Sequence, residues 1–436
     1  MSAAGAHDAP GGAPGGQANG PEVLSFGCRL NTYEGHAMRA LAREGGFGDV
    51  LLVNTCAVTA EAEREARKAI RRAARDNPGR PILVTGCAAQ LAPARWAALP
   101  GVARVVGNAG KLRAESWRRD APPLPVGDVM AARDAPAPPV TDFAGRARAF
   151  VQVQGGCDHR CTFCIIPFGR GPSRSVPMGA VVAQARAAVE AGLREVVLTG
   201  VDIASYGPDL PGQPSLGQML RRLLALVPEL PRLRLSSLDP AAIDEDLWRL
   251  IAEEPRLMPH LHLSLQHGND LMLKRMRRRH SRAGALECAA RARRLRPGIA
   301  LGADLIAGFP TETEEHFTEM LSLVEEAGLS FLHVFPFSER PGTPAARMPQ
   351  LPVPLRRERA ARLRAAGAGA AARFYATRLE HARMGQEETV LLEAPDRGHT
   401  EHFAPLRLLR GTGAHGALLR ARVTGADARG LLAEVA

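Results

Sequence analysis

Three cysteines within one short segment constrain this chain more than any other feature of its sequence. Cys157, Cys161 and Cys164, here called the central triad, follow a C-x3-C-x2-C spacing just after a predicted strand at residues 149–154. Three thiolates on one loop can bind three irons of a cubane 4Fe–4S cluster and leave the fourth iron open. An open iron can hold S-adenosylmethionine by its amino and carboxylate groups. The alternatives are a zinc site, which needs a fourth ligand, and a disulfide, which needs an oxidising compartment.

The length and net charge of the chain indicate which partners and which cellular location to expect. Its 436 residues carry a formal net charge of +11, from 56 Lys and Arg against 45 Asp and Glu. Such a basic surface favours a polyanionic partner, RNA or DNA before a membrane. No apolar run approaches the roughly 18 residues of a membrane span. Residues 1–20 lack the regions of a signal peptide, so we expect a disordered tail and a cytoplasmic protein, in which cysteines serve metals or catalysis.

A second group of cysteines stands at predicted strand ends. Each follows a short apolar run: Cys28 after residues 23–27, Cys56 after residues 50–55 and Cys87 after residues 81–86. Helical patterns at 32–44 and 60–75 separate these runs, and the alternation predicts an open parallel α/β sheet. Because ligands bind beyond the carboxyl ends of such strands, the three thiols, here called the N-terminal triad, should converge on a second cluster. The alternatives are a zinc site or three unrelated buried cysteines.

Residues 143–370 are predicted to form a partial (β/α)6 barrel. The expected strands are residues 149–154, 195–199, 233–237, 260–266, 300–306 and 331–337. The expected helices are residues 178–191, 216–226, 241–253, 270–277, 283–295 and 314–327. Chemistry in such a barrel occurs at the carboxyl ends of the strands, where the central triad lies. Cys288 is expected to pack inside a helix, and His260, His262 and His267 to be strand and turn residues rather than iron ligands.

Polar residues and glycines lie at or just after the ends of several of these strands. They are Gly200, Asp202, Ser237, Asp239, Ser264, Gln266, Asp304 and Gly308. Each alone could be a turn or a cap, but at successive strand ends they favour a ligand pocket, in which Asp202 could hold a ribose or an amino group. The basic run at residues 274–282 is either a solvated helix end or a contact for RNA phosphate or a cofactor carboxylate. Arg170 and Arg340 are further candidates on loops.

The last part of the chain changes character. Residues 371–436 begin with a helical stretch at 373–383, and short strands follow at residues 388–393, 406–409, 417–424 and 431–435. The glycine-rich turns between them predict a small β-barrel, a fold that often binds oligonucleotides, and Phe403 could stack on a base. Between the first two domains, the proline-rich residues 126–142 are expected to form an extended linker.

The cysteine motifs resemble those of the radical S-adenosylmethionine methylthiotransferases. The segments that carry the resemblance are GCRLNTYE at 27–34, NTCAVT at 54–59, TGCAAQ at 85–90 and CDHRCTFCIIP at 157–167. The resemblance implies a methylthiotransferase domain at 21–125, a radical S-adenosylmethionine domain at 143–370 and a TRAM-like RNA-binding domain at 371–436. It also implies two 4Fe–4S clusters, one on each triad, and an S-adenosylmethionine pocket lined by the eight strand-end residues. The reaction also needs electrons from a donor that the resemblance does not identify.

Within the family, four segments look most like the branch that modifies N6-threonylcarbamoyladenosine at position 37 of tRNA. They are residues 27–34, 157–167, 333–338 and 340–346. The resemblance implies that one cluster cleaves S-adenosylmethionine to a radical that removes the C2 hydrogen of adenine, while the other presents sulfur. The alternatives within the family act on isopentenyladenosine in tRNA or on an aspartate of a ribosomal protein. Outside enzymology, the alternative is a metal-bearing RNA-binding protein.

Overall fold

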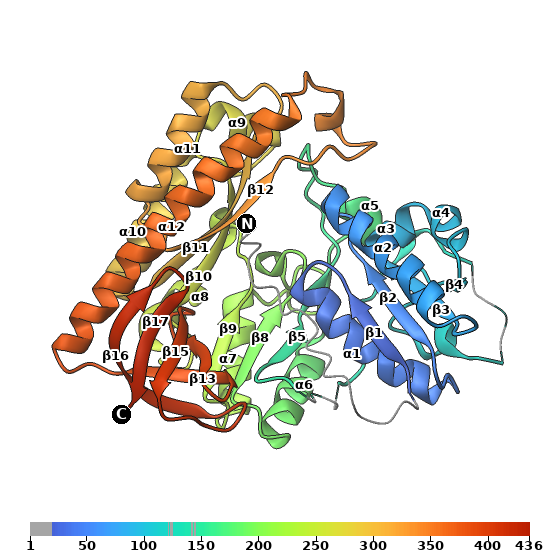
Figure 1. Cartoon of the computed structure of the whole chain (residues 1–436), viewed down its shortest axis with the longest axis horizontal. Helices are drawn as coiled ribbons and strands as arrows, with labels where there is room; N and C mark the ends of the chain where they lie inside the picture. The colour runs from blue at the N-terminus through green and yellow to red at the C-terminus, as the bar shows by residue number, and fades with distance from the viewer. Residues whose placement is uncertain (1–19, 121, 123–124, 141–142, 144) are drawn as a thin grey trace.

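The computed structural model describes residues 20–120, 122, 125–140, 143 and 145–436. Three domains follow one another along the chain: an amino-terminal α/β sheet, a central partial barrel and a carboxy-terminal β-barrel (Figure 1). The predicted tail at 1–20 lies almost entirely outside the described residues. Among the described residues, no helix is both long and apolar enough to cross a membrane.

The N-terminal domain is a four-stranded parallel sheet in the order β1-β2-β3-β4. Its strands are β1 Glu22–Ser25, β2 Leu51–Thr55, β3 Ile82–Gly86 and β4 Val102–Val105. Its helices are α1 Arg29–Glu44, α2 Ala60–Asp76, α3 Cys87–Leu91 and α4 Pro93–Ala97. The strands β2 and β3 are buried along their whole length, which is typical of parallel strands covered on both faces. Leu52 and Leu83 pack under α1, whereas Val53 and Val84 pack with α2, α3 and α4.

Sequence patterns found three of these strands and the two long helices, but missed β4, α3 and α4. β4 is only four residues long and partly exposed, so its apolar pattern is weak. Helix α1 begins at Arg29, three residues earlier than predicted, because the Cys28 carbonyl already accepts a hydrogen bond from the Thr32 N–H.

The central domain is the expected six-stranded partial barrel. Its strands are β5 Ala149–Gln152, β8 Glu195–Thr199, β9 Arg232–Leu235, β10 His260–Gln266, β11 Ala300–Ala307 and β12 Phe331–Pro336. They form two parallel three-stranded sheets, joined by a parallel bridge between Leu238 and Leu263. A short antiparallel pair, β6 Gln154–Gly155 and β7 Arg174–Ser175, brackets the central triad.

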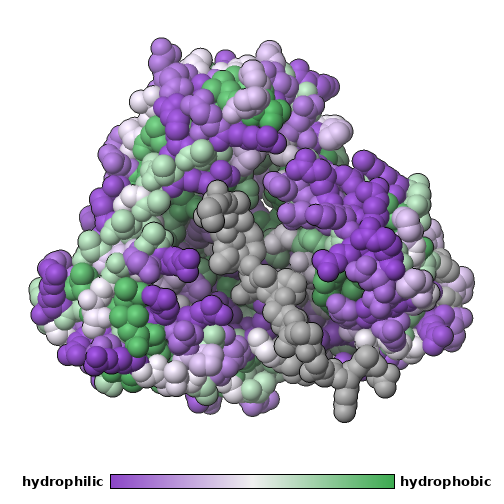
Figure 2. Space-filling model, viewed as in Figure 1, coloured by the Kyte–Doolittle hydropathy of each residue, from purple (hydrophilic) through white to green (hydrophobic). Residues whose placement is uncertain are grey.

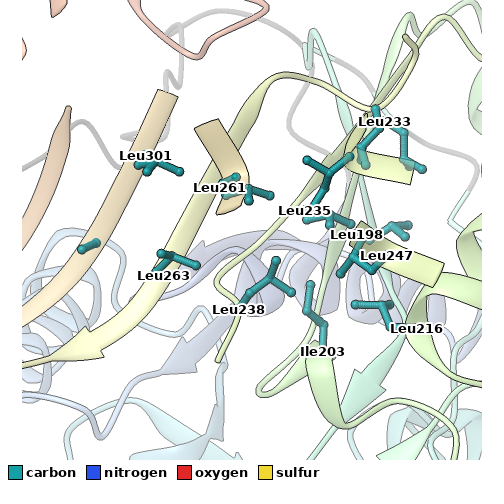
Figure 3. Close-up of a cluster of buried hydrophobic side chains, with 14 of the residues drawn as sticks. Leu198, Ile203, Leu216, Leu233, Leu235, Leu238, Leu247, Leu261, Leu263 and Leu301 are labelled. Atoms are coloured by element: carbon teal, nitrogen blue, oxygen red, sulfur yellow. The ribbon is translucent and has the colours of Figure 1, made fainter. Parts of the chain in front are cut away.

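Helices cover the outer face of these strands (Figure 1). They are α6 Met178–Glu190, α7 Leu216–Leu226, α8 Glu245–Glu253, α9 Asp270–Met276, α10 Arg282–Leu295 and α11 Glu314–Glu326. Helix α8 starts four residues later than predicted. Asp244 is its N-cap, and the Asp244 carboxylate accepts a hydrogen bond from the Leu247 N–H. Leucines from β8 to β11 and from α7 and α8 form one apolar core between the layers (Figure 3). Cys288 packs in this core, as expected.

A long helix joins the central domain to the last one. Helix α12, Val353–Arg383, packs on β11, β12 and α11 and then reaches β16, so the expected boundary at residues 370/371 falls inside it. The closed barrel that follows has the strand order β13-β14-β15-β17-β16. Its strands are β13 Glu388–Ala394, β14 Arg397–Thr400, β15 Pro405–Arg410, β16 Leu418–Asp427 and β17 Gly430–Val435. The prediction missed β14, which is short and follows a tight turn.

The described part of the proline-rich linker, residues 126–140, is irregular apart from a short 3-10 helix at Val129–Ala131, and it contacts both of the first two domains. The Tyr33 hydroxyl of α1 donates to the Pro138 carbonyl over 3.1 Å. The Gln184 side chain of α6 exchanges two hydrogen bonds with the Val140 backbone, at 2.7 and 2.6 Å. These contacts hold the linker between α1 and α6 and help fix the orientation of the N-terminal domain.

Candidate metal centres

The N-terminal triad comes together at the carboxyl edge of its sheet, as the strand pattern predicts. Cys28 stands at the N-cap of α1, Cys56 follows β2 and Cys87 begins α3. The loops approach closely: a Cβ atom at Gly27, whose φ is +97°, would lie 2.6 Å from the Cys56 Sγ. Only glycine fits there. Burial, and then the nearby Cys28 and Cys87 thiols, raise the pKa of Cys56 to about 12.

A buried ion-pair network lies beside this triad. The Glu34 carboxylate accepts hydrogen bonds from Lys111 Nζ at 2.6 Å and from Arg170 Nη1 at 2.7 Å. Asn54 Nδ2 donates to the same carboxylate over 3.2 Å. Burial alone would raise the pKa of Glu34, but the Arg170 and Lys111 cations lower it to about 2. Two buried cations thus face one buried carboxylate, which leaves positive charge to balance a group of thiolates.

Arg170 reaches this network from the central domain. It ends the short helix α5, Ile166–Arg170, only six residues after Cys164. Its guanidinium also donates to Asn31 Oδ1 at 2.6 Å, and the charges that raise its pKa include Cys87 and Glu34. The prediction of Arg170 and Arg340 as loop contacts for an RNA phosphate or a cofactor carboxylate is therefore not supported. Both are buried, and Arg340 pairs with Glu63 of α2 at 2.9 Å.

Backbone contacts fix the loop that carries the central triad. A Cβ atom at Gly156, whose φ is +71°, would lie 1.8 Å from the Pro172 carbonyl oxygen, so this turn requires glycine. The Thr162 N–H donates to the Met276 carbonyl at 3.1 Å, and the Thr162 hydroxyl donates to the Arg275 carbonyl at 2.8 Å. The loop is thus tied to the end of α9.

Arg278 links this loop to two of the predicted pocket residues. Its guanidinium lies 3.6 Å from the Cys161 Sγ, 3.2 Å from an Asp239 oxygen and 2.8 Å from the Ser264 carbonyl oxygen. Arg278 is buried by these contacts, so this member of the basic run is not part of a solvated helix end. Burial raises the pKa of Cys164 to about 12, and the neighbouring thiols of the triad add to the shift.

Asp202 faces the central loop from the end of β8. Its carboxylate lies 2.8 Å from His159 Nε2, inside the C-x3-C segment, and accepts a 2.6 Å hydrogen bond from Ser205. Burial would raise the pKa of Asp202, but the hydrogen bonds from His159 and Ser205 lower it. Asp202, Asp239 and Ser264 are therefore gathered around the central triad through His159 and Arg278. Sequence reasoning gave neither linking residue a role of its own, because no spacing rule marks them.

Asp304 is the centre of a separate polar cluster inside the barrel. Its carboxylate accepts from Ser237 at 3.1 Å and lies 3.0 Å from His262 and 3.2 Å from His333. Burial would raise the pKa of Asp304, but the two histidines lower it. Both carboxylate oxygens are thus already engaged. The other predicted positions lie at the ends of β8, β10 and β11: Gly200, Gln266 and Gly308.

Phe403 is enclosed where the β-barrel meets the other two domains. Its ring stacks on His399 with centroids 4.6 Å apart, and three arginine guanidiniums lie against it. The sequence interpretation of this ring as a platform for a base is therefore not supported, because protein groups occupy its faces.

The two triads fit iron–sulfur clusters better than single metal ions. Among the described residues, three groups of metal-binding side chains bring their donor atoms within 4.8 Å of one another, and none contains more than one cysteine. Sulfurs around one zinc ion would lie about 3.8 Å apart, since each Zn–S bond is about 2.3 Å. Each triad has three free thiols and one buried arginine beside it, Arg170 or Arg278. Soft sulfur donors next to a buried cation suit an anionic thiolate-bound cluster.

Comparisons with known proteins agree with this geometry. The Radical SAM superfamily matches residues 151–324, and the Uncharacterized protein family UPF0004 matches residues 22–107. The chain is 49% identical to the threonylcarbamoyladenosine tRNA methylthiotransferase MtaB of Rickettsia prowazekii, over 89% of this chain and 91% of the relative. It is 38% identical to the protein of the same name from Bacillus subtilis, over 74% of each.

Solved structures agree on the fold. The radical S-adenosylmethionine methyltransferase TsrM of Kitasatospora setae superposes with a TM-score of 0.50 at 16% identity, covering 72% of this chain and 69% of that one. The six cysteines, their placement on two domains and the extended similarity to MtaB proteins lead to one conclusion: the chain belongs to the methylthiotransferase family of radical S-adenosylmethionine enzymes.

Proposed function

We propose that this protein adds a methylthio group to C2 of N6-threonylcarbamoyladenosine at position 37 of tRNA. The observation that carries the proposal is the pairing of the two triads. Each gathers three thiols at the carboxyl ends of parallel strands, and α5 with Arg170 joins the central loop directly to the N-terminal triad. The relatives with 49% and 38% identity bear the name of this activity and match most of the chain.

The proposal assigns one 4Fe–4S cluster to each triad. When bound, these groups supply the electron that cleaves S-adenosylmethionine and the open iron from which sulfur is delivered. The protein side chains orient the two sites and balance their charge. Glu34, Lys111 and Arg170 set the charge beside the N-terminal triad, and Arg278 does so beside the central triad.

S-adenosylmethionine is proposed to bind at the central triad among the strand-end residues. Asp202 and Asp239 supply carboxylates for its amino and ribose groups, and Arg278 supplies a cation near Cys161 for its carboxylate. Gly200, Ser237, Ser264, Gln266, Asp304 and Gly308 complete the proposed lining. This assignment predicts that the cofactor lies between the central loop and the carboxyl ends of β8 to β11.

The tRNA is proposed to approach from the face on which the three domains meet. Figure 2 shows this face hollowed between the central and N-terminal domains, with hydrophilic residues over α2. On the β-barrel, Arg407, Arg410 and Arg420 are more than half exposed. Their ion pairs with Asp427, Glu434 and Glu387 lie at the surface, where such pairs are weak and phosphates can compete for the cations. An anticodon-loop base is single-stranded and can be turned out into such a hollow at modest energetic expense.

The test uses anaerobically purified, cluster-reconstituted full-length protein. It is incubated with S-adenosylmethionine, dithionite and tRNA that carries threonylcarbamoyladenosine but no methylthio group, and the digested nucleosides are analysed by mass spectrometry. We expect 5′-deoxyadenosine and a methylthio adduct on threonylcarbamoyladenosine. Cofactor cleavage without that adduct would reject the substrate, and the same assay with isopentenyladenosine tRNA and with the ribosomal protein would then identify the branch.

A further inference from the structure

Three arginines surround one aromatic ring where all three domains meet. The ring is Phe403 of the β-barrel. The guanidinium carbons lie 5.4 Å from the ring centroid for Arg29 of the N-terminal domain, 5.6 Å for Arg148 before β5 and 4.7 Å for Arg234 of β9. Cation–π contacts stabilise each arginine, but they do not neutralise its charge. The cluster therefore concentrates positive charge in the interior of the molecule.

Carboxylates of the protein pair with two of these arginines but not with the third. Glu195 pairs with Arg148 at 2.9 Å and with Arg234 at 3.2 Å. Glu393 is a second partner of Arg148. The Arg29 side chain, by contrast, forms no hydrogen bond or ion pair with any residue that the structure describes.

Asp304 is the carboxylate that attracts Arg29 most strongly, but it already has other partners. The Asp304 carboxylate holds His262 at 3.0 Å, His333 at 3.2 Å and Ser237 at 3.1 Å. It acts on Arg29 only through space. A half-buried guanidinium with no anion of its own is costly, and binding an anionic ligand would remove that cost.

The local electrostatics of Arg29 point the same way. It is the first residue of α1, where the helix dipole disfavours a cation and favours an anion. A bound anion would satisfy both the helix end and the arginine.

The position of Arg29 in the chain identifies which anion this is. Arg29 directly follows Cys28, a member of the N-terminal triad. In adenine, C2 and C6 flank the same ring nitrogen, so a site that delivers sulfur to C2 lies next to the substituent on N6. On the proposed substrate, that substituent is a threonylcarbamoyl group, which ends in a carboxylate.

We propose that Arg29 binds the carboxylate of the N6-threonylcarbamoyl group and so selects this base over bases with neutral N6 substituents. The inference rests on the proposed function. A guanidinium can pair with a carboxylate through two parallel hydrogen bonds, which gives direction as well as charge. Arg148 and Arg234 keep their own carboxylates and hold Phe403 as a wall beside the Arg29 side chain.

The test compares two synthetic anticodon stem-loop RNAs. One carries N6-threonylcarbamoyladenosine and the other its methyl ester, which removes the charge and changes little else. Wild type, Arg29→Gln and Arg29→Lys are compared with Arg294→Gln, which alters an exposed arginine of α10. The readouts are kcat/KM for methylthiolation and, without reductant, the Kd of each fluorescently labelled RNA. Iron content is measured for every variant.

Wild type and Arg294→Gln are expected to favour the acid over the ester by about 10- to 100-fold, the range for a hydrogen-bonded charge pair. Arg29→Gln should lose this preference with its iron content unchanged, and Arg29→Lys should keep part of it. Equal weakening of acid and ester in Arg29→Gln would overturn the proposal and assign Arg29 to a backbone phosphate. A full preference in Arg29→Gln would also overturn it and leave Arg29 as a support for Phe403. If wild type cleaves the cofactor but modifies neither RNA, the proposed function itself fails.

Discussion

The two cysteine triads differ in how the chain builds them. The central triad lies within eight residues on one loop, between β6 and α5. The N-terminal triad is collected from the ends of three parallel strands that are 28 and 31 residues apart at their cysteines. A contiguous loop can present its thiols whenever its own turn forms, whereas the collected set exists only when its whole sheet has folded. The N-terminal triad is therefore more sensitive than the central triad to substitutions far from its cysteines.

The two triads also differ in the origin of their neighbouring cation. Arg278, beside Cys161, belongs to the same domain as the central triad and is held by Asp239 and Ser264. Arg170, beside the N-terminal triad, comes from the other domain and is held by Glu34 and Asn31. The N-terminal site is thus completed only when the two domains dock, which makes domain docking part of its assembly.

Removal of one thiol from each triad should separate their functions most strongly. Cys164→Ala is expected to lose about four of eight irons and to abolish cleavage of S-adenosylmethionine. Cys56→Ala should lose a similar amount of iron but still cleave the cofactor, while methylthiolation disappears. Iron analysis and detection of 5′-deoxyadenosine measure both effects. Cys288→Ala, in the core of α10, is the matched control and should keep all its iron. Loss of cleavage in Cys56→Ala would show that the triads do not act separately.

Replacement of Arg170 should damage the N-terminal site although Arg170 belongs to the central domain. Arg170→Met leaves Glu34 with Lys111 alone and removes a cation beside the thiols, so we expect a loss of about 3–5 kcal/mol in the free energy of unfolding. The iron of the N-terminal triad should be lost selectively, with cofactor cleavage retained. Urea unfolding and iron analysis test this. Arg340→Met is the matched control, because it removes another arginine–glutamate pair between the same two domains, whose partner Glu63 is less deeply buried than Glu34. Equal effects of both variants would reduce Arg170 to an ordinary interdomain contact.

The same contrast explains what the sequence could predict. The strands, the helices and the convergence of both triads follow from periodicity and from the rule that ligands bind at the carboxyl ends of parallel strands. The side-chain partners do not follow, because contacts such as Glu34 with Arg170 join residues 136 positions apart in the chain. The pattern placed Arg170 on a loop, since a five-residue helix carries almost no periodic signal. Asp304 was correctly placed at a strand position, but its engagement by His262 and His333 depends on the register of three strands.

The free energy of unfolding should depend on pH through Glu34 of the N-terminal site, and we expect this effect to be smaller than those of the cysteine and Arg170 variants. The folded-state pKa of Glu34 is about 2, below the ordinary value of about 4.3. A lowered pKa stabilises the fold above the unfolded-state value, and this stability is lost as the pH falls toward the folded-state value. The loss should therefore occur between about pH 4.5 and pH 2 and be on the order of 3 kcal/mol.

Urea unfolding of wild type and Glu34→Gln across this pH range isolates the contribution of Glu34. The difference between the two proteins should be largest at pH 6 to 7 and shrink as the pH falls below about 4.5, because protonation then makes the wild-type side chain neutral as well. Both proteins lose acid-labile iron alike, so their difference cancels that effect. Glu254→Gln is a suitable control, because its carboxylate pairs with Arg256 in a partly exposed position of the central domain, where solvent weakens the interaction. A constant difference between wild type and Glu34→Gln from pH 7 to pH 3 would mean that packing, rather than the Glu34 charge, couples the two domains.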